Sequence, residues 1–519
     1  MTGDRGEMGT VRFDEISTYF AGHFQRLWQD SKPLAKLFKT NIKNYLYDTG
    51  TNTVFACDEI EFCLLDNLFK YGTEESLKKV ASLYPPSKIF VALNTLGDLI
   101  EKKNILMSRT PVRFGGSQFD NLEYSVRNSL GMIQLEVTER CNLRCAYCLY
   151  GDQYRYKRNH GTRDMDYDLA RKAIDHLAVS SGNNQDVAVT FYGGEPLLRV
   201  PFVKACVAYA RTRLRDKEPK FSVTTNATLI DKETARYLAS EEINVHVSID
   251  GPEEIHNQYR VNTRDVGSFK WTISGLKNLI DAYGQRCRHI TLSMVYSPPF
   301  SRDRIERVAG LWDQFKWLPR DIGISITYAQ GFSPPGIAHG ERPDNSLFSW
   351  ARDDYIEHYR VGKPPHPISS SIINKELVRI VQRPEYSTPV QTYYLNGCCL
   401  PGARKQFVSV DGKILLCERV ESGFSIGNIQ DGMDIDAIKK IFVNEYSEKS
   451  IESCSRCWAL QLCAICYVHA FSDSKFDLIK KERNCNLMRK RILDFLTLFC
   501  ELLEIDGSGL DFLTNWQVR

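Results

Sequence analysis

The sequence predicts an α/β fold, a partial (β/α)6 barrel with a small domain before it and a cysteine-rich region after it. Three observations lead to this prediction. Strand-like and helix-like apolar patterns alternate over residues 132–328, polar or glycine-rich motifs follow the first four strands, and most of the 16 cysteines fall in three groups. Alternating strands and helices imply a parallel sheet, because parallel strands need long crossover connections.

The overall composition is that of an ordinary globular protein. The chain has 519 residues, of which 43% are apolar and 25% charged. This length predicts about three domains at ~150 residues each. No stretch reaches the ~20 apolar residues of a membrane span, and the polar N-terminus is typical of neither a signal nor a transit peptide. Because 67 basic residues nearly balance 64 acidic ones, neither a membrane nor nucleic acid is an expected partner.

Residues 34–110 are predicted to form a winged-helix-like domain. Two β-prone runs surround an Asp/Gly/Asn turn at 48–52, which indicates a hairpin. A helix is expected to begin with Thr73 as its cap and to end at Pro85-Pro86, and a further helix follows it. An accessory domain that binds nucleic acid is the alternative interpretation of this composition.

Residues 130–332 carry the predicted barrel, an open, TIM-like half-barrel. The six expected strands are, in chain order, 133–137, 187–191, 221–225, 245–249, 290–296 and 324–328. Parallel sheets place their functional residues at the carboxyl ends of the strands, so the motifs found there should meet at one rim. These motifs are Cys141–Cys148, Gly193–Pro196, Thr224–Asn226 and Ser248–Pro252.

The rest of the chain divides into three further segments. Residues 333–394 are predicted to be an irregular bridging insertion, residues 395–490 contain the remaining cysteine groups, and residues 491–519 should contain an apolar helix over 492–503. Five scattered cysteines lie among apolar neighbours and are expected to be small buried side chains. They are Cys57, Cys63, Cys206, Cys287 and Cys500.

The first cysteine group, Cys141-x3-Cys145-x2-Cys148, has the chemistry of an iron–sulfur site. Three thiolates within eight residues cannot complete a tetrahedral zinc site by themselves. They suit a [4Fe–4S] cluster with three irons held by the protein and the fourth open to a bidentate ligand. S-adenosylmethionine (SAM) offers such a ligand, and Gly193-Gly194 would let the backbone approach it closely.

This segment resembles the signature of the radical SAM superfamily, in which a radical made from SAM attacks a C–H bond. The resemblance implies that the cluster reduces SAM to methionine and a 5′-deoxyadenosyl radical, which abstracts hydrogen. It also implies a cofactor site. Its residues would be Gly193, Gly194 and Glu195 at the methionyl amino group, Asn226 near the ribose, Ser248 and Arg260 at the carboxylate, and Tyr147 before the last cysteine.

The C-terminal cysteines form the second strong pattern, Cys399-x12-Gly-x4-Cys417 and then Cys454-x2-Cys457-x5-Cys463-x2-Cys466 with a later Cys485. Two zinc knuckles need a longer separation between their pairs. The pattern resembles the SPASM/twitch domain of radical enzymes that modify peptides and proteins, although this family usually has three residues where two separate Cys463 from Cys466.

This second resemblance implies two auxiliary [4Fe–4S] clusters, three clusters in total. One would be held by Cys399, Cys417 and Cys466, and the other by Cys454, Cys457, Cys463 and Cys485. Cys398 either fills the fourth position of the first auxiliary cluster or leaves that position open for a substrate thiolate.

The N-terminal domain resembles the precursor-recognition element of enzymes that mature ribosomally made peptides (RiPPs). Such elements bind a leader peptide as an added strand, so that main-chain hydrogen bonds give the affinity. All modules together resemble a radical peptide maturase, and the segments around Cys417 and Cys457 resemble maturases that form a Cys thioether to another residue's carbon. The resemblance also implies a flavodoxin- or ferredoxin-type electron donor and a reducing cytoplasm.

Three alternatives stay open at this point. Two are enzymes, a maturase that forms a carbon–carbon crosslink and a sulfatase-type maturase that makes formylglycine. The third is an iron–sulfur regulator that binds DNA through the winged helix, against which stands the lack of a concentrated Lys/Arg recognition helix. The sequence identifies neither the precursor nor the catalytic base.

Overall fold

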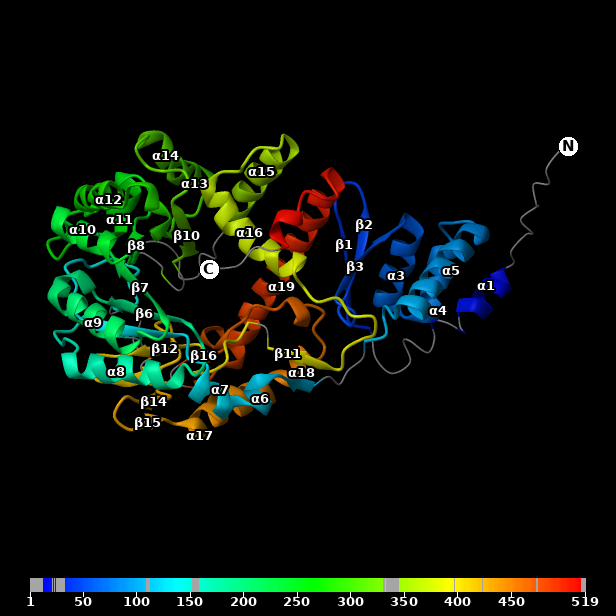
Figure 1. The fold of residues 1–519 in the computed structure, drawn as a ribbon. Helices are drawn as coiled ribbons and strands as arrows, with labels where there is room; N and C mark the ends of the chain where they lie inside the picture. The colour runs from blue at the N-terminus through cyan, green and yellow to red at the C-terminus, as the bar shows by residue number, and fades with distance from the viewer. Residues whose placement is uncertain are drawn as a thin grey trace.

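The computed structural model describes most of the chain. The described residues are 13–20, 22, 24, 33–108, 113–151, 158–329, 332, 345–395, 397–421, 423–472 and 475–514. Within these ranges no helix is both long and apolar enough to cross a membrane. The N-terminal domain lies at one end of the molecule, the barrel at the other, and the cysteine-rich region between and below them (Figure 1).

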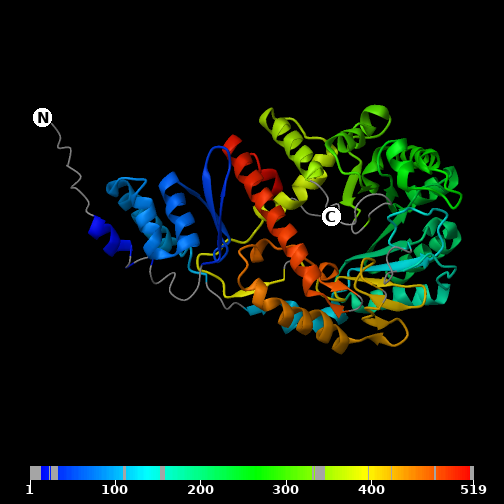
Figure 2. The same cartoon turned by 180° about the vertical axis from the view of Figure 1, so that it is seen from behind.

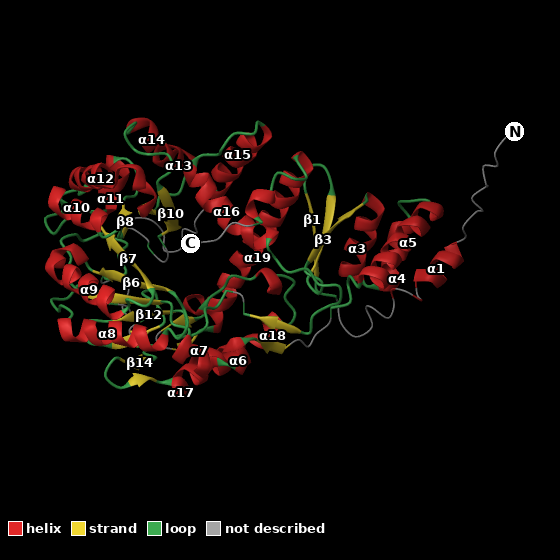
Figure 3. Ribbon diagram, viewed as in Figure 1, coloured by secondary structure: helices red, strands yellow, loops and turns green. Residues whose placement is uncertain are grey.

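The N-terminal domain combines a three-stranded antiparallel sheet with helices (Figure 3). Its strands β1 (Ala35–Lys39), β2 (Asn44–Asp48) and β3 (Thr53–Cys57) pair in chain order. Its helices are α1 (Phe13–Phe20), α3 (Glu59–Tyr71), α4 (Thr73–Ala81) and α5 (Pro86–Lys103). The predicted hairpin is therefore confirmed as β2–β3.

Two predicted helix limits in this domain are wrong. The N-cap of α4 is Gly72, whose positive φ of 78° suits a residue without a Cβ, and not Thr73. The helix ends at Ala81, and Pro86 begins α5 instead of ending α4. Proline fits the first turn of a helix because the backbone N–H that it lacks would be unpaired there anyway.

The predicted parallel sheet is confirmed. Six strands pair side by side in chain order, and every pair is parallel: β5 (Met132–Thr138), β6 (Asp186–Gly193), β7 (Glu218–Thr225), β8 (Asn244–Ser248), β9 (Ile290–Tyr296) and β10 (Gly323–Tyr328). The helices between them are α8 (Tyr167–Ser180), α9 (Val200–Arg213), α10 (Lys232–Ser240), α11 (Glu253–Tyr259), α12 (Phe269–Tyr283), α13 (Arg302–Ala309) and α14 (Leu311–Gln314).

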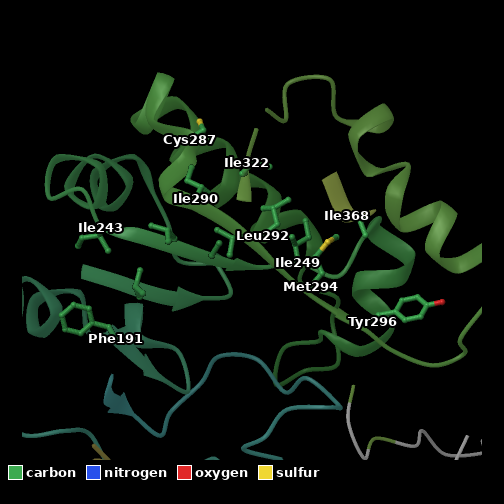
Figure 4. Close-up of a cluster of buried hydrophobic side chains, with 14 of the residues drawn as sticks. Phe191, Ile243, Ile249, Cys287, Ile290, Leu292, Met294, Tyr296, Ile322 and Ile368 are labelled. Carbon is green, nitrogen blue, oxygen red and sulfur yellow. The ribbon is translucent and has the colours of Figure 1, made fainter. Parts of the chain in front are cut away.

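The two faces of this sheet differ in polarity. Phe191, Leu292 and Met294 point into the apolar core beneath the helices (Figure 4). In-register neighbours on the opposite face are small and polar, as where the Thr190 hydroxyl lies 2.8 Å from that of Ser222. Parallel strands covered on both faces are apolar throughout. The alternation here leaves a polar face for the interior of the barrel.

The C-terminal region continues the barrel sheet instead of forming a detached domain. Strand β12 (Lys405–Val408) pairs with β5 in parallel, and β13 (Lys413–Leu415), β14 (Gly427–Asn428) and β15 (Gly432–Met433) extend the sheet from there. The sheet stays open, with β10 and β15 at its two ends. Smaller elements nearby are β4 (Arg113–Gly115), α6 (Ser117–Asp120), α7 (Leu122–Asn128), β11 (Thr392–Tyr394), α17 (Ile435–Ile438), α18 (Tyr446–Cys454), β16 (Phe471–Ser472) and β17 (Lys475–Phe476).

Two segments contain more helix than the sequence predicts. The insertion predicted to be irregular contains α15 (Ser346–Arg360) and α16 (Pro367–Val381), and α16 packs against β10. The C-terminal helix α19 runs from Leu478 to Ile505, so it begins well before residue 492 and includes Cys485. It crosses between the barrel and the N-terminal domain (Figure 2). Its first half is rich in charged side chains, so the apolar pattern does not reveal it.

The turn between β2 and β3 attaches the N-terminal domain to the rest of the chain. The Thr49 hydroxyl donates to the carbonyl of Trp458 at 2.6 Å. The Asn52 side chain donates to the carbonyl of Pro384 at 2.9 Å, and Arg383 donates back to the carbonyl of Asn52 at 2.8 Å. Hairpin turns usually lie in solvent, whereas this one is buried in an interface.

Replacing Tyr47 tests this interface. Its side chain is fully buried, its ring lies 6.2 Å from that of Trp458, and its hydroxyl donates to Asn52 at 2.7 Å. We expect Tyr47→Ala to lower the free energy of unfolding by about 3–5 kcal/mol, and Tyr47→Phe by about 1 kcal/mol for the lost hydrogen bond. Urea unfolding measures both. Tyr124→Ala is the control, because that ring is 70% exposed, and equal losses in the two alanine variants would contradict the interface.

Candidate active site

The motifs predicted at the strand ends do meet at one rim of the sheet. The backbone N–H of Gly194, after β6, donates to the carbonyl of Thr138 at the end of β5. The N–H of Glu195 donates to the carbonyl of Arg140, one residue before Cys141. The glycine-rich motif thus supports the first residues of the cysteine loop.

Gly193 and Gly194 are required by this contact between two stretches of backbone. At Gly193 φ is +127°, and an added Cβ would lie 2.4 Å from the carbonyl oxygen of Thr138. At Gly194 an added Cβ would lie 2.1 Å from the carbonyl oxygen of Arg140. The sequence predicts a close approach of these glycines to a ligand, and the structure adds a close approach to the cysteine loop itself.

Glu195 links the second motif to the third. Its buried carboxylate accepts hydrogen bonds from the Leu197 N–H at 3.0 Å, the Thr225 hydroxyl at 2.8 Å and the Asn226 N–H at 2.8 Å. Burial raises the pKa of this carboxyl to about 7, although the hydrogen bonds act in the opposite direction. Both oxygens accept hydrogen bonds from the chain, and the contact expected with the methionyl amino group stays a prediction.

Asn226 extends the same connection to the cysteine loop. Its side-chain N–H donates to the side-chain oxygen of Asn142 at 2.8 Å, and Asn142 donates to the Thr228 hydroxyl at 2.8 Å. Asn142 directly follows Cys141, so this pair fixes the start of the loop. Ser248, at the end of β8, lies half-buried opposite Ser293 of β9. The expected contacts of Asn226 and Ser248 with SAM stay predictions.

A buried ion pair lies beside the middle cysteine. Arg260 donates to the carboxylate of Asp250 at 3.1 Å, and its guanidinium lies 3.8 Å from the sulfur of Cys145. The hydroxyl of Tyr147 donates to the same carboxylate. All these side chains except the thiol are at least nine-tenths buried. The sequence places Asp250 in a motif but does not reveal this role, which depends on a partner ten residues further along the chain.

The three thiols of the loop suit a cluster. Backbone N–H groups of Leu143 and Tyr150 lie 3.4 Å from the sulfurs of Cys141 and Cys148, respectively. Burial raises the pKa of both Cys141 and Cys145 to about 12, so metal binding must displace the thiol protons. Hydrogen bonds to the sulfurs are a feature of iron–sulfur sites. Among the described residues, no three His, Cys, Asp or Glu side chains converge closely enough for a single metal ion.

A buried ionic network joins the first cysteine loop to the region of Cys417. Glu136, on the interior face of β5, accepts from the Tyr150 hydroxyl at 2.6 Å and lies 3.6 Å from Arg158. Arg158 donates to the backbone carbonyl of Glu418, the neighbour of Cys417. A cavity of ≈ 330 Å³ adjoins this network and is lined mainly by charged side chains. This network therefore connects the loop of Cys141, Cys145 and Cys148 to the segment that contains Cys417.

The remaining cysteines of the two predicted sets lie near one another in the fold, and their division between two clusters stays a prediction. Cys417 and Cys466 lie close enough to Cys399 to interact electrostatically with it. Cys398 interacts in the same way with Cys399 and Cys466, and also with Cys463 of the other predicted set. Cys454, Cys457 and Cys485 lie within range of Cys463. Both sets combine residues far apart in the sequence, which favours two shared sites over independent pairs. Both alternatives for the fourth position of the first set, Cys398 or an open site, stay predictions.

The five scattered cysteines lie away from these sets in the chain. Cys57, Cys206, Cys287 and Cys500 are buried, which confirms the prediction for them, and Cys63 is half-buried.

Comparison with known proteins identifies the class. Residues 135–311 match the family model of the Radical SAM superfamily. An uncharacterized protein from Methanothermobacter thermautotrophicus is 31% identical over 224 residues, which are 42% of this chain and 77% of that protein. The chain belongs to the radical SAM superfamily, whose members use a [4Fe–4S] cluster and SAM.

Relatives with a named activity match over a smaller share of their length. A serine-type anaerobic sulfatase-maturating enzyme from Bacteroides thetaiotaomicron is 32% identical over 145 residues, 28% of this chain and 34% of that enzyme. The chain spans only 38%, 34% and 40% of the length of three curated relatives, an uncharacterized protein from Methanocaldococcus jannaschii and two sulfatase-maturating enzymes. The structure of anSMEcpe with bound AdoMet has a TM-score of 0.55 at 18% identity, covering 75% of this chain and 96% of that one, so the two share a fold.

Replacing Asp250 tests the ion pair beside Cys145. We expect Asp250→Asn to lower the free energy of unfolding of the metal-free protein by about 3–5 kcal/mol, because Arg260 is left buried without its counter-charge. Urea unfolding measures the loss. Asp186→Asn, which breaks the exposed pair with Lys220, is the matched control and should cost less than about 1 kcal/mol. Similar losses in both variants would contradict a special role for the buried pair.

Proposed function

We propose that this protein is a radical SAM maturase that joins a cysteine sulfur of a ribosomally made precursor peptide to the carbon of another residue. The observation that carries the proposal is the direct attachment of the N-terminal three-stranded sheet to the cysteine-rich region. The Thr49 hydroxyl bonds the carbonyl of Trp458, which follows Cys457. A peptide held by this sheet would therefore lie next to one of the cysteine sets.

The cysteine sets are suited to three [4Fe–4S] clusters. Cys141, Cys145 and Cys148 would hold the cluster that binds SAM, and the two C-terminal sets would hold the auxiliary clusters. When bound, the first cluster and SAM would supply a 5′-deoxyadenosyl radical that abstracts one hydrogen atom. An auxiliary cluster would accept one further electron. Asn142 and Glu195 keep the first loop in place, and the polar interior face of the sheet provides room and hydrogen-bonding groups for the substrate. An electron donor of the flavodoxin or ferredoxin type would reduce the SAM-binding cluster.

The edge strand β3 is the proposed site for the leader. It pairs with β2 on one side and, among the described strands, with none on the other. An added strand would find its main-chain donors and acceptors there. The structure of anSMEcpe matches almost all of its own length but only 75% of this chain, so about a quarter of this chain has no counterpart in it. This chain therefore contains more than the fold that the two proteins share.

A sulfatase-type maturase that makes formylglycine is the second candidate. The observation in its favour is the similarity to the sulfatase-maturating enzyme from Bacteroides thetaiotaomicron. The two candidates differ in the requirement for a leader and in the chemistry of the product, so one reaction mixture distinguishes them.

Iron content and SAM cleavage test the cofactors. Anaerobically reconstituted protein should bind about twelve irons per chain, four for each cluster, and should form 5′-deoxyadenosine with a reductant. We expect Cys141→Ala to lose about four irons and all 5′-deoxyadenosine, because only the SAM-binding cluster is removed. Cys206→Ala, a buried cysteine on α9 outside the three sets, should keep both. Full activity in Cys141→Ala would contradict the assignment.

Mass spectrometry of a modified precursor tests the product. A thioether removes two hydrogens and one alkylatable thiol, because the sulfur forms the new bond. Deleting the leader from the precursor should abolish the modification. Adding the same leader as a separate peptide should restore part of it. Loss of two hydrogens with every thiol retained would indicate a carbon–carbon link. Efficient formylglycine formation on a leaderless peptide would support the sulfatase-type candidate instead.

A further inference from the structure

A fully buried lysine lies within the second C-terminal cysteine set. Lys481, in the first turn of α19, is 1% exposed. Lysine is almost never buried to this extent without a partner. Its ammonium lies 3.4 Å from the sulfur of Cys454 and 3.9 Å from that of Cys485. Cys463 also lies within electrostatic range of it.

Among the residues that the structure describes, no carboxylate pairs with this ammonium. Across the described ranges, Lys481 takes part in no ion pair, and the only ring that its ammonium faces there is that of Tyr446, at 5.9 Å. The first cysteine loop differs in this respect. There the guanidinium of Arg260 lies near Cys145 but is paired with Asp250 at 3.1 Å. One site therefore has a balanced pair beside its sulfurs, and the other has an uncompensated positive charge.

A neighbouring arginine adds to the contrast. Arg489, two turns further along α19, approaches the sulfur of Cys457 at 3.9 Å and donates to the side chain of Asn486. Arg489 is partly exposed, so solvent screens its charge, whereas Lys481 acts through a dry surrounding. The buried ammonium is thus the stronger electrostatic element of the set.

We propose that Lys481 raises the reduction potential of the auxiliary cluster held by Cys454, Cys457, Cys463 and Cys485, and so makes this cluster the preferred electron acceptor. The proposal rests on the proposed function, because it requires that cluster. One-electron reduction adds one negative charge to the cluster, and a fixed positive charge nearby at low dielectric stabilises the reduced form. Lys481 contacts no substrate. Its role is electrostatic, because its charge acts on the cluster.

The test is a redox titration of the reconstituted full chain, followed by electron paramagnetic resonance. A Cys141→Ala/Cys145→Ala/Cys148→Ala background removes the SAM-binding cluster and leaves the auxiliary clusters. In Lys481→Met, we expect the equilibrium constant for one-electron reduction of one auxiliary cluster to fall at least tenfold, which is a shift of about 59 mV to more negative potential. Lys481→Arg keeps the charge and should return the potential toward the wild-type value.

Two further variants make the result specific. Lys481→Gln keeps a side-chain N–H donor but no charge, and we expect its cluster potential to shift as in Lys481→Met. If the methionine variant loses iron, the glutamine variant provides the measurement. Lys490→Met changes an exposed lysine on the same helix and should leave the potential unchanged. A wild-type potential in an iron-replete Lys481→Gln or Lys481→Met would overturn the proposal alone. A wild-type chain with only about four irons would overturn the three-cluster function and this proposal with it.

Discussion

The pairing of β5 with a strand on each side is the constraint on which the rest of the structure depends. On one side β6 brings the glycine-rich motif to the start of the cysteine loop, and on the other β12 brings the C-terminal region into the same sheet. Strand β5 itself leads directly to Cys141. Backbone hydrogen bonds in one continuous sheet therefore fix the first cysteine group relative to the elements that carry the others.

A chain of short polar contacts then sets the shape of the rim. Glu195 bonds the backbone at Asn226, and Asn226 bonds Asn142 beside Cys141. Such fully bonded buried networks make a local structure rigid, whereas a half-satisfied one would be costly. Neighbouring strand ends thus hold the loop in place, and its sulfurs would be available to the proposed cluster.

The sequence predicts those parts of the fold that depend on local patterns. All six barrel strands appear where apolar residues alternate, and the signature cysteines and glycines lie at the strand ends as expected. Long-range pairing is not visible in such patterns, so the continuation of the sheet through β12 and the burial of the 48–52 turn come only from the structure. The first half of α19 is not predicted because its many charged residues give no clear apolar pattern. In the sequence Lys481, one of these residues, looks like an ordinary surface lysine. Its partners are cysteines on another element, 27 residues away in the case of Cys454.

The buried turn between β2 and β3 has one more consequence. Because Thr49 and Asn52 are bonded to Trp458 and Pro384, the edge of β3 stands at a fixed span from the cysteine-rich region. A peptide anchored at that edge would reach the barrel only if the segment between its leader and its modified residue is long enough. The distance of a residue from the leader would then decide whether it is modified, and wide variation in the side chains around it would be tolerated.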